Sequence, residues 1–335
     1  MAEPARKPVW KRVLSGVWTV VGAFLVAEVL LRLLSSYFLI YDLEMVKYAT
    51  DLKVRSPLPG VVHQHRSNAA ATLMGVDVSL NSMGHRSPEL SVPKPRDERR
   101  IHFIGSSILL GWGVPVAQGM VARTAALLNR NMSPRTGRRY VGINAGIGNY
   151  NTFYEVELFA RQLDRTKPDL VVLQYYINDA EPNPTGRDNP FIMNSQVVAL
   201  AYLRLKSIGA VGAGSLQEHY KALYHDGQPD WERTKGALAK LKSIADSRGI
   251  PVVVLLVPEI HDFSLASPYE EIYRILAKTL ARLNIPLINP VGTMREAFGD
   301  DPRAAWIARD DPHPSARVHE VLANALYRYI ARVGL

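Results

Sequence analysis

Several places in the chain carry hydroxyl, imidazole or carboxylate groups that could act together. Ser107 follows a glycine turn at the end of an apolar run that closes with Gly105. His313 lies near the other end of the chain, three residues after Asp310. A carboxylate can hold an imidazole through Nδ1–H and leave Nε2 free to take a proton from a serine hydroxyl. The pattern predicts Ser107 as nucleophile, His313 as general base and Asp310 as the orienting carboxylate. Asp311 is the second choice, since we expect it to face solvent.

Two other positions are suited to stabilising the negative oxygen that forms when a hydroxyl attacks an ester carbonyl. Gly146 ends a second apolar run, and its small size would let a backbone N–H approach the reacting oxygen. Asn178 follows a third run and carries an amide that can donate hydrogen bonds. Donors of both kinds form oxyanion holes. Further residues expected near a substrate are Asp179, Ser106, Tyr176, Glu259 and His261, the last being either part of the site or an ordinary loop histidine in contact with solvent.

Composition argues against several other chemistries. The 335 residues include no cysteine, so the chain has no disulfide framework, thiolate nucleophile or cysteine-based zinc site. It has no HExxH or comparable ligand spacing, and the glycine pairs at 111–113 and 146–148 do not complete a GxGxxG fingerprint. We therefore expect no metal and no cofactor. The net charge of +9 is scattered over the chain without a zinc-finger or RRM pattern, so nucleic acid is not an expected partner.

The elements that must position these groups are those of a parallel sheet with helices on both faces. Short apolar runs alternate with segments of helical period, which is typical of such a sheet. In this architecture ligands collect beyond the carboxyl ends of the strands, where the candidate residues would lie. The expected strands are 101–105, 140–146, 169–177, 251–258 and 286–290. The expected helices are about 117–131, 152–164, 231–248, 268–283 and 314–332, with Pro314 in the first turn of the last one.

The motifs, in this order, resemble those of the SGNH hydrolase family, also called GDSL esterases, over about residues 100–335. Gly105-Ser106-Ser107 corresponds to the first block of the family, and Gly146 corresponds to the glycine of the second. The third block is matched by Tyr176-Ile177-Asn178-Asp179, and the fifth by the segment from Asp310 to His313. All of these matches lie at or after expected strand ends or just before the last expected helix.

The resemblance implies a flavodoxin-like three-layer α/β/α fold with a five-stranded parallel sheet. It also implies an oxyanion hole made of the Ser107 N–H, the Gly146 N–H and the Asn178 side chain. Two positions depart from the family pattern: Ser106 stands in place of the usual aspartate, and Tyr176 in place of a glycine. The first change is expected to alter a supporting hydrogen bond, and the second to narrow or reshape the acyl pocket.

The N-terminal part of the chain predicts a membrane anchor. Residues 13–40 form an apolar run that can cross a hydrocarbon core of roughly 30 Å, and the run is longer than the roughly 7–15 apolar residues of a cleaved signal peptide. Basic residues precede the run, and acidic residues follow it closely. The positive-inside rule then places residues 1–12 in the cytoplasm and the rest outside, on the periplasmic face of an inner membrane.

Two charged residues lie inside this apolar run. Glu28 and Arg32 interrupt the run at i,i+4 spacing, either as a pair near the outer interface or as a contact to a partner inside the membrane.

Residues 41–98, rich in proline, are expected to be a connector to the hydrolase domain at 99–335. Residues 180–230 form a long insertion in that domain, of the kind that often acts as a lid.

Three functional hypotheses follow from these expectations. The main one is an extracytoplasmic esterase that removes an acyl group, expected to be acetyl, from a carbohydrate through a serine acyl-enzyme. In the second, the same residues transfer the acyl group to an exported polysaccharide. The third is a weakly catalytic binding or scaffold subunit of a membrane assembly, motivated by Ser106 and the Glu28–Arg32 pair. The expected partners are an acylated carbohydrate or other ester and the lipid bilayer around residues 13–40.

Overall fold

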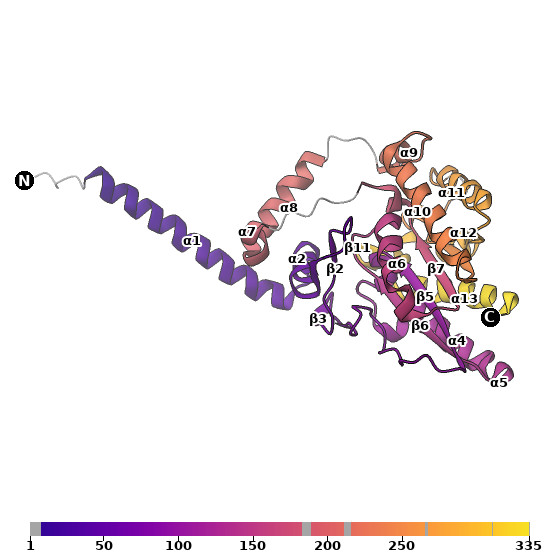
Figure 1. The fold of residues 1–335 in the computed structure, drawn as a ribbon. Coiled ribbons are helices and arrows are strands. Elements are labelled where there is room, and N and C mark those ends of the chain that lie inside the picture. Colours follow the sequence, from indigo (N-terminus) through magenta and orange to yellow (C-terminus); the bar gives the residue numbers. More distant parts are fainter. Residues whose placement is uncertain (1–7, 183–188, 211–215, 265–266, 310, 335) are drawn as a thin grey trace, which may run out of the picture. The chain divides into compact units, whose positions relative to one another are not determined.

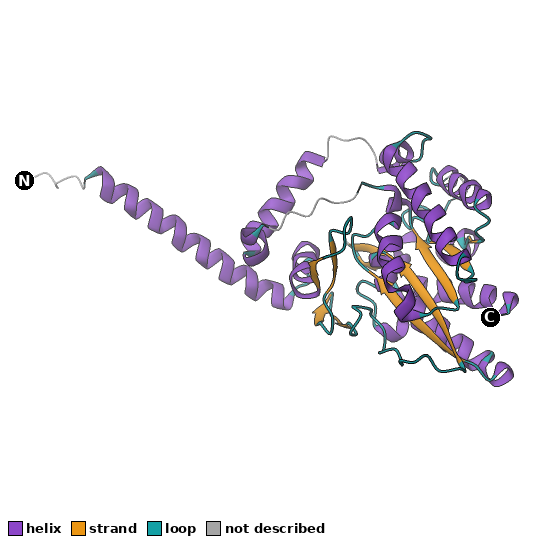
Figure 2. Cartoon of the chain, viewed as in Figure 1, coloured by secondary structure: helices purple, strands orange, loops and turns teal. Residues whose placement is uncertain are grey.

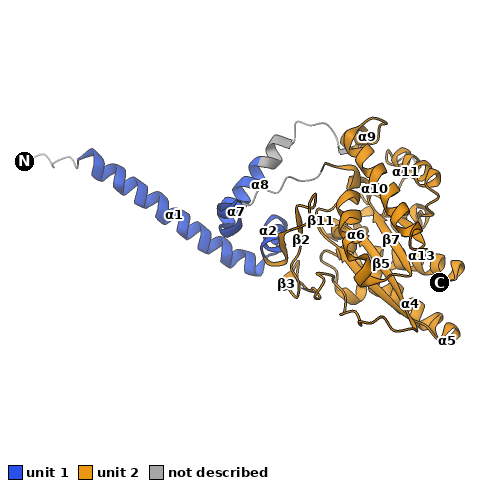
Figure 3. Ribbon diagram, viewed as in Figure 1, with its two compact units in different colours: residues 1–50, 187–212 blue, residues 51–186, 213–335 orange. Residues whose placement is uncertain are grey.

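The computed structural model describes residues 8–182, 189–210, 216–264, 267–309 and 311–334. The chain divides into two compact units, each treated separately below (Figure 3). The first unit comprises residues 1–50 and 187–212, and the second comprises residues 51–186 and 213–335. The division after residue 50 differs from the boundary expected near residue 98, because residues 51–97 pack with the sheet instead of forming a separate connector.

A five-stranded parallel sheet forms the centre of the second unit (Figure 1). Its strand order is β6-β5-β7-β8-β9, so the chain starts at an inner strand, adds one edge and then builds toward the other. This is a flavodoxin-like order, and it confirms the predicted fold class. The strands lie within or overlap the five predicted ranges: β5 (Glu98–Gly105), β6 (Arg139–Gly146), β7 (Leu170–Tyr175), β8 (Val252–Leu256) and β9 (Leu287–Ile288).

Helices cover both faces of this sheet and make it the middle of three layers (Figure 2). Two hydrophobic clusters result, one on each face, so the central strand β7 is buried at every position. Strands buried on both faces are continuous apolar runs, which is why they are recognisable in the sequence. The helices of one cluster are α6 (Thr152–Thr166), α10 (Pro229–Asp246) and α11 (Glu270–Arg282); those of the other are α4 (Met120–Asn131), α12 (Val291–Phe298) and α13 (Ala316–Val333).

The last helix begins later than predicted. Pro314 is the final residue of a short strand, β11 (Asp311–Pro314), and is not in the first turn of α13. Ser315 is the N-cap of that helix, which starts at Ala316. The strand β11 pairs antiparallel with β10 (Trp306–Ala308), and this hairpin carries His313.

Several short elements were not predicted. Residues 53–79 form two antiparallel hairpins, β1 (Lys53–Arg55) with β2 (His63–His65) and β3 (Ala70–Leu73) with β4 (Val76–Ser79). These strands have three or four residues, too few to show a period in the sequence. The remaining short elements of this unit are α5 (Ser133–Thr136), α9 (Leu216–Leu223), η1 (Val116–Gln118) and η3 (Pro302–Ala305), in addition to those described with the site.

The first unit consists of helices. α1 (Val9–Tyr37) is followed by α2 (Tyr41–Leu52), most of which belongs to this unit, and the insertion contributes α7 (Pro190–Asn194) and α8 (Gln196–Ala210). Among the described residues, α1 is the one helix long and apolar enough to cross a membrane. The lid role of residues 180–230 stays a prediction, part of which falls on residues outside the described ranges.

Candidate active site

The candidate nucleophile lies at the carboxyl end of the strand β5. Ser107 is the first residue of a short helix, α3 (Ser107–Leu110), with Ser106 as its N-cap. The turn requires glycine at position 105, because a Cβ there would lie 2.7 Å from Gln174 Oε1 and 2.9 Å from Leu109 Cβ. The strand therefore turns sharply into the helix and presents the Ser107 hydroxyl at the carboxyl end of the sheet.

The structure brings Ser107 and His313 together, as the sequence predicts. Ser107 Oγ and His313 Nε2 are 3.0 Å apart, although 206 residues separate them in the chain. The hairpin of β10 and β11 holds the histidine there through the register Trp306↔Pro314 and Ala308↔Asp311. The side chain of His313 is 17% exposed, so the ring is mostly shielded from water.

The carboxylate that contacts the histidine belongs to Asp311, which corrects the assignment made from sequence. Asp311 Oδ1 lies 2.6 Å from His313 Nδ1 and also accepts a hydrogen bond from the His313 backbone N–H at 3.0 Å. Asp310, the residue preferred from sequence, lies outside the described residues. The expectation that Asp311 faces solvent is wrong, since its side chain is fully buried. Asp311 and His313 are two apart on one strand, and residues at this spacing point to the same side.

Trp112 is a member of the site that sequence reasoning missed. Its indole Nε1–H donates to Asp311 Oδ2 at 2.9 Å, and its ring centre lies 5.9 Å from that of His313. Burial acts to raise the pKa of the Asp311 carboxyl. Hydrogen bonds from His313 and Trp112 outweigh that effect and hold the pKa below its ordinary value of 3.8. Asp311 is thus an anion at neutral pH, able to stabilise a protonated His313.

The structure gives Gly146 a different role from the one predicted. Its N–H donates to Asn144 Oδ1 at 3.0 Å and is therefore already used within the strand end. A Cβ at this position would lie 2.3 Å from the backbone nitrogen of Leu110, so glycine allows α3 to pack directly on β6. Close packing against α3 therefore requires glycine at this position, and the part of Gly146 in an oxyanion hole stays a prediction.

The other two predicted oxyanion donors keep suitable positions. The Ser107 N–H lies in the first turn of α3, where a helix leaves its N–H groups without intrahelical acceptors. Asn178 lies in η2 (Ile177–Ala180), which follows β7, the strand directly paired with β5. The Asn178 side chain is half-buried, and its Oδ1 has no hydrogen-bond partner among the described residues. Their participation in an oxyanion hole remains a prediction.

The loop that follows β6 is held by side chains of the β1–β2 hairpin, a contact that the sequence did not predict. Lys53 Nζ, on β1, donates to the Gly148 carbonyl at 2.7 Å and to Asn149 Oδ1 at 3.1 Å. His63 Nε2, on β2, also lies 3.2 Å from the Gly148 carbonyl. Asn149 has a left-handed backbone with φ of 65°, a conformation that is uncommon outside glycine. The first hairpin of the segment expected to be a connector thus fixes the loop at the carboxyl end of an active-site strand.

Two residues predicted on the substrate side are buried supports instead. Ser106 is 4% exposed, and its N–H donates to Gln174 Oε1 at 3.2 Å. Asp179 is fully buried, and its Oδ2 accepts the N–H of Tyr176 at 2.9 Å, which fixes the turn that carries Asn178. Burial raises the pKa of the Asp179 carboxyl well above its usual range, as it does for the neighbouring buried Glu155.

The remaining predicted substrate-side residues form one hydrogen-bonded cluster. Tyr176 donates its hydroxyl to Glu259 Oε1 at 3.1 Å, and the same oxygen contacts His261 Nδ1. The His261 ring packs edge-on against Trp306 at 4.8 Å, and Trp306 pairs with Pro314, the residue after His313. The cluster therefore lies beside the hairpin of the active-site histidine. The hydrogen bond to Glu259 raises the pKa of His261 above its ordinary 6.5.

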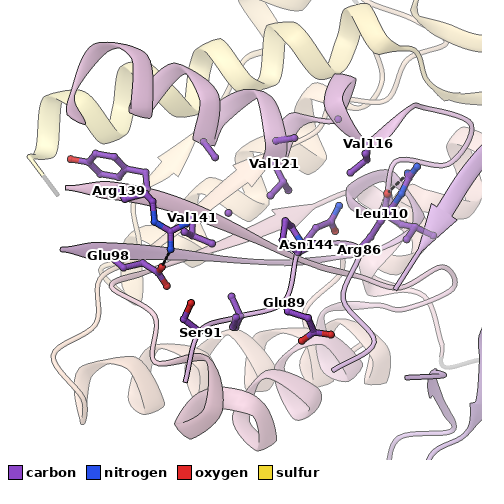
Figure 4. Close-up of a pocket in the computed structure, with 18 residues that line it drawn as sticks. Arg86, Glu89, Ser91, Glu98, Leu110, Val116, Val121, Arg139, Val141 and Asn144 are labelled. Carbon is purple, nitrogen blue, oxygen red and sulfur yellow. Dashed lines mark hydrogen bonds and ion pairs between the residues drawn. The ribbon is translucent and has the colours of Figure 1, made fainter. Parts of the chain in front are cut away.

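A separate pocket is lined by none of the predicted site residues (Figure 4). It borders the edge strand β6 and is walled by apolar side chains such as Val121 and Val141. The ion pair of Arg139 with buried Glu98 lies at one end, and Arg86, which donates to the Leu110 carbonyl at 3.0 Å, lies at the other. Across the described part of the chain, no group of three or more histidines and carboxylates could hold a metal ion.

Comparison with known families agrees with this geometry. The model of the GDSL-like lipase/acylhydrolase family matches residues 103–321, well over half of the chain. The chain belongs to this family. A GDSL-like acylhydrolase is an ester hydrolase, and the match runs from β5 through the hairpin of His313 into α13. No curated protein matches the chain.

Solved structures similar to this GDSL-like chain include TesA and two esterases. TesA is 18% identical, with 70% of this chain and 99% of TesA covered and a TM-score of 0.44. A catalytic mutant of Axe2, an acetylxylan esterase from Geobacillus stearothermophilus, is 18% identical over 71% of this chain and 94% of its own, with a TM-score of 0.43. CEX, a two-domain esterase active on acetylated mannans, is 14% identical over 70% of this chain and 50% of its own, with a TM-score of 0.45.

Proposed function

We propose that this GDSL-like acylhydrolase is a membrane-anchored serine esterase with Ser107 as nucleophile, His313 as general base and Asp311 as the orienting carboxylate. The observation that carries the proposal is the continuous relay of short contacts from Ser107 Oγ through His313 to Asp311, at 3.0 and 2.6 Å. A serine hydroxyl is a weak nucleophile unless a base removes its proton, and this relay supplies that base in the required orientation.

The proposed reaction proceeds through an acyl-enzyme. Ser107 Oγ attacks the ester carbonyl while His313 Nε2 takes the hydroxyl proton, and buried Asp311 stabilises the resulting imidazolium. The Ser107 N–H and the Asn178 amide are the proposed donors to the oxyanion. His313 then gives the proton to the leaving alcohol. A water molecule, activated by the same histidine, releases the acyl group from the serine.

The proposed substrate is an O-acetyl ester on a carbohydrate. Tyr176 supports a short acyl group, because it directly follows β7 at a position where a glycine would leave more room. The carbohydrate part follows from the proposed location outside the cytoplasm. That location is supported by α1, whose composition is that of a membrane anchor or a signal sequence, and by the basic residues that precede its apolar run.

The test is covalent labelling of the full-length protein in detergent with a fluorophosphonate probe, followed by peptide mapping. We expect one labelled serine, Ser107, and loss of both labelling and p-nitrophenyl acetate turnover in Ser107→Ala. Ser106→Ala is the matched control, because that hydroxyl is buried against Gln174. Turnover of the Ser107→Ala protein equal to wild type would contradict the proposal. Acetylated product from an added oligosaccharide would show transfer in place of hydrolysis.

A further inference from the structure

The two charged residues within the apolar helix α1 have partners in the same compact unit. Glu28 accepts hydrogen bonds from Ser195 Oγ at 2.9 Å and from the backbone N–H groups of Gln196 and Val197, both at 3.0 Å. Arg32 donates to Glu28 at 2.7 Å and to the Asn194 carbonyl at 2.8 Å. The carboxylate thus occupies the N-terminus of α8, which a helix macrodipole makes favourable for an anion.

One side of α1 faces α8 over residues 27–35, near the end of the helix. Within α1, Glu28, Leu31 and Ser35 are the described residues that are partly buried while the others are exposed, and their i, i+3, i+7 spacing places them on one side. Ser35 Oγ donates to Gln196 Oε1 at 3.0 Å, next to the Glu28 contact. Between the helices an apolar groove is lined by Ala27, Leu30, Leu31 and Leu34 of α1 and by Val197, Leu200, Ala201 and Arg204 of α8.

The contact lies near one end of the apolar run. About 20 helical residues, at about 1.5 Å each, cross a hydrocarbon core of roughly 30 Å. Counted from Val13, where the apolar run begins, that length ends near Arg32. Glu28 and the start of α8 would therefore be at the outer boundary of the bilayer if α1 spans it.

α8 has the composition of a membrane element but not the length of a span. Gln196–Leu205 is an apolar helical segment, and the 15 residues of α8 would extend only about 22 Å at about 1.5 Å each. Figure 1 shows α8 crossing α1 instead of running parallel to it. Its outward side chains include Tyr202, 47% exposed, and Leu205, 70% exposed, while Phe191 on the adjoining α7 is 75% exposed.

We propose that α7 and α8 lie in the outer headgroup region of the bilayer, with their exposed apolar side chains in lipid and Glu28 fixing α8 to the membrane anchor. The occupant of this apolar surface is the lipid bilayer. A short apolar helix that crosses a spanning helix at the boundary of the hydrocarbon core has the geometry of an interfacial helix. This inference depends on the membrane anchoring proposed above and assigns the central part of the insertion to membrane attachment.

The test uses the absence of native cysteines, which allows single spin labels on the full-length chain. Labels are placed at Leu205→Cys and Tyr202→Cys in vesicles of phosphatidylethanolamine and phosphatidylglycerol. Collision with oxygen reports lipid, and collision with a water-soluble nickel chelate reports water. Leu25→Cys on α1, 57% exposed, is the lipid reference, and Val92→Cys, 85% exposed, is the water reference.

We expect the oxygen-to-nickel ratio at positions 205 and 202 to be severalfold above that at Val92 and to approach that at Leu25. Glu28→Gln should lower the ratio at position 205 and increase label mobility, whereas Lys11→Gln, at the other end of the same helix, should not. High nickel access at position 205, or no access to either collider, would overturn the inference, the latter because the surface would then be covered by protein. Water access at Leu25 would instead contradict the anchoring itself.

Discussion

Trp112 Nε1 donates a hydrogen bond to Asp311 Oδ2, 2.9 Å away, while the other oxygen of the same carboxylate contacts His313. Trp112 follows the nucleophile helix, and Asp311 lies in the hairpin near the end of the chain, 199 residues later. The contact therefore joins the two segments that carry Ser107 and His313. The hydrogen bond also satisfies one oxygen of a buried carboxylate, which would be costly to leave without a donor.

Asp311→Asn should lower kcat by about 10⁴-fold, the loss found for the equivalent change in another serine hydrolase with this relay. An asparagine favours the wrong histidine tautomer and cannot stabilise the imidazolium. The measurement is steady-state hydrolysis of p-nitrophenyl acetate. The matched comparison is Asp310→Asn, which should retain most activity. A loss confined to Asp310→Asn would reverse the assignment between the two neighbours.

Trp112→Phe should shift the acidic limb of the pH–rate profile to higher pH, because one of the donors that lower the pKa of Asp311 is removed. The variant should also lose about 1.5–3 kcal/mol of stability, the usual contribution of a hydrogen bond to a charged group. Denaturant unfolding and a pH series for kcat measure the two effects. Trp306→Phe is the control, since its indole N–H donates to the Ile260 carbonyl and not to Asp311. An unshifted acidic limb in Trp112→Phe would show that the indole does not tune the carboxylate.

Gly146→Ala should destabilise the protein by at least about 1–3 kcal/mol, the usual cost of overpacking, because the new methyl group would meet backbone atoms of α3 that cannot move aside. Thermal unfolding checks this. Gly292→Ala is the control in α12, where a Cβ meets nothing within 4 Å and a helix former replaces glycine. Full stability of Gly146→Ala would show that close packing under α3 does not require glycine at this position.

The His261 ring should titrate above its ordinary pKa of 6.5, and Glu259→Gln should lower that pKa. The folded-state pKa is raised, so the contact adds stability that is complete below pH 6.5 and is lost as the pH rises through the raised value. NMR titration of the ring, assigned with His261→Gln, measures the shift, and urea unfolding across the same pH range measures the stability. A His261 pKa unchanged by Glu259→Gln would show that the two side chains do not interact in solution.

Much of the second unit could be predicted from the sequence, because the patterns that indicate its strands and helices are local. The five strands are covered on both faces and therefore appear as unbroken apolar runs. Ser107 and His313 were identifiable because each follows or precedes a regular element in a family order. The sequence also carries a local signal that favours Asp311. Asp311 and His313 each precede a proline, which keeps both residues extended, and residues two apart on an extended chain share a side.

Hydrophobic period and motif order are properties of neighbouring residues, so the sheet and most of its helices could be predicted from the sequence. The same signals made Ser107 and His313 the candidates for nucleophile and base. The folded structure alone shows that Trp112 supports Asp311, that Gly146 is needed for packing, and that Lys53 holds the loop after β6. It also supplied the partner of Glu28, which is the N-terminus of a helix 168 residues away. These relationships depend on which segments meet in space, and the periodicity of a single segment carries no information about its distant neighbour.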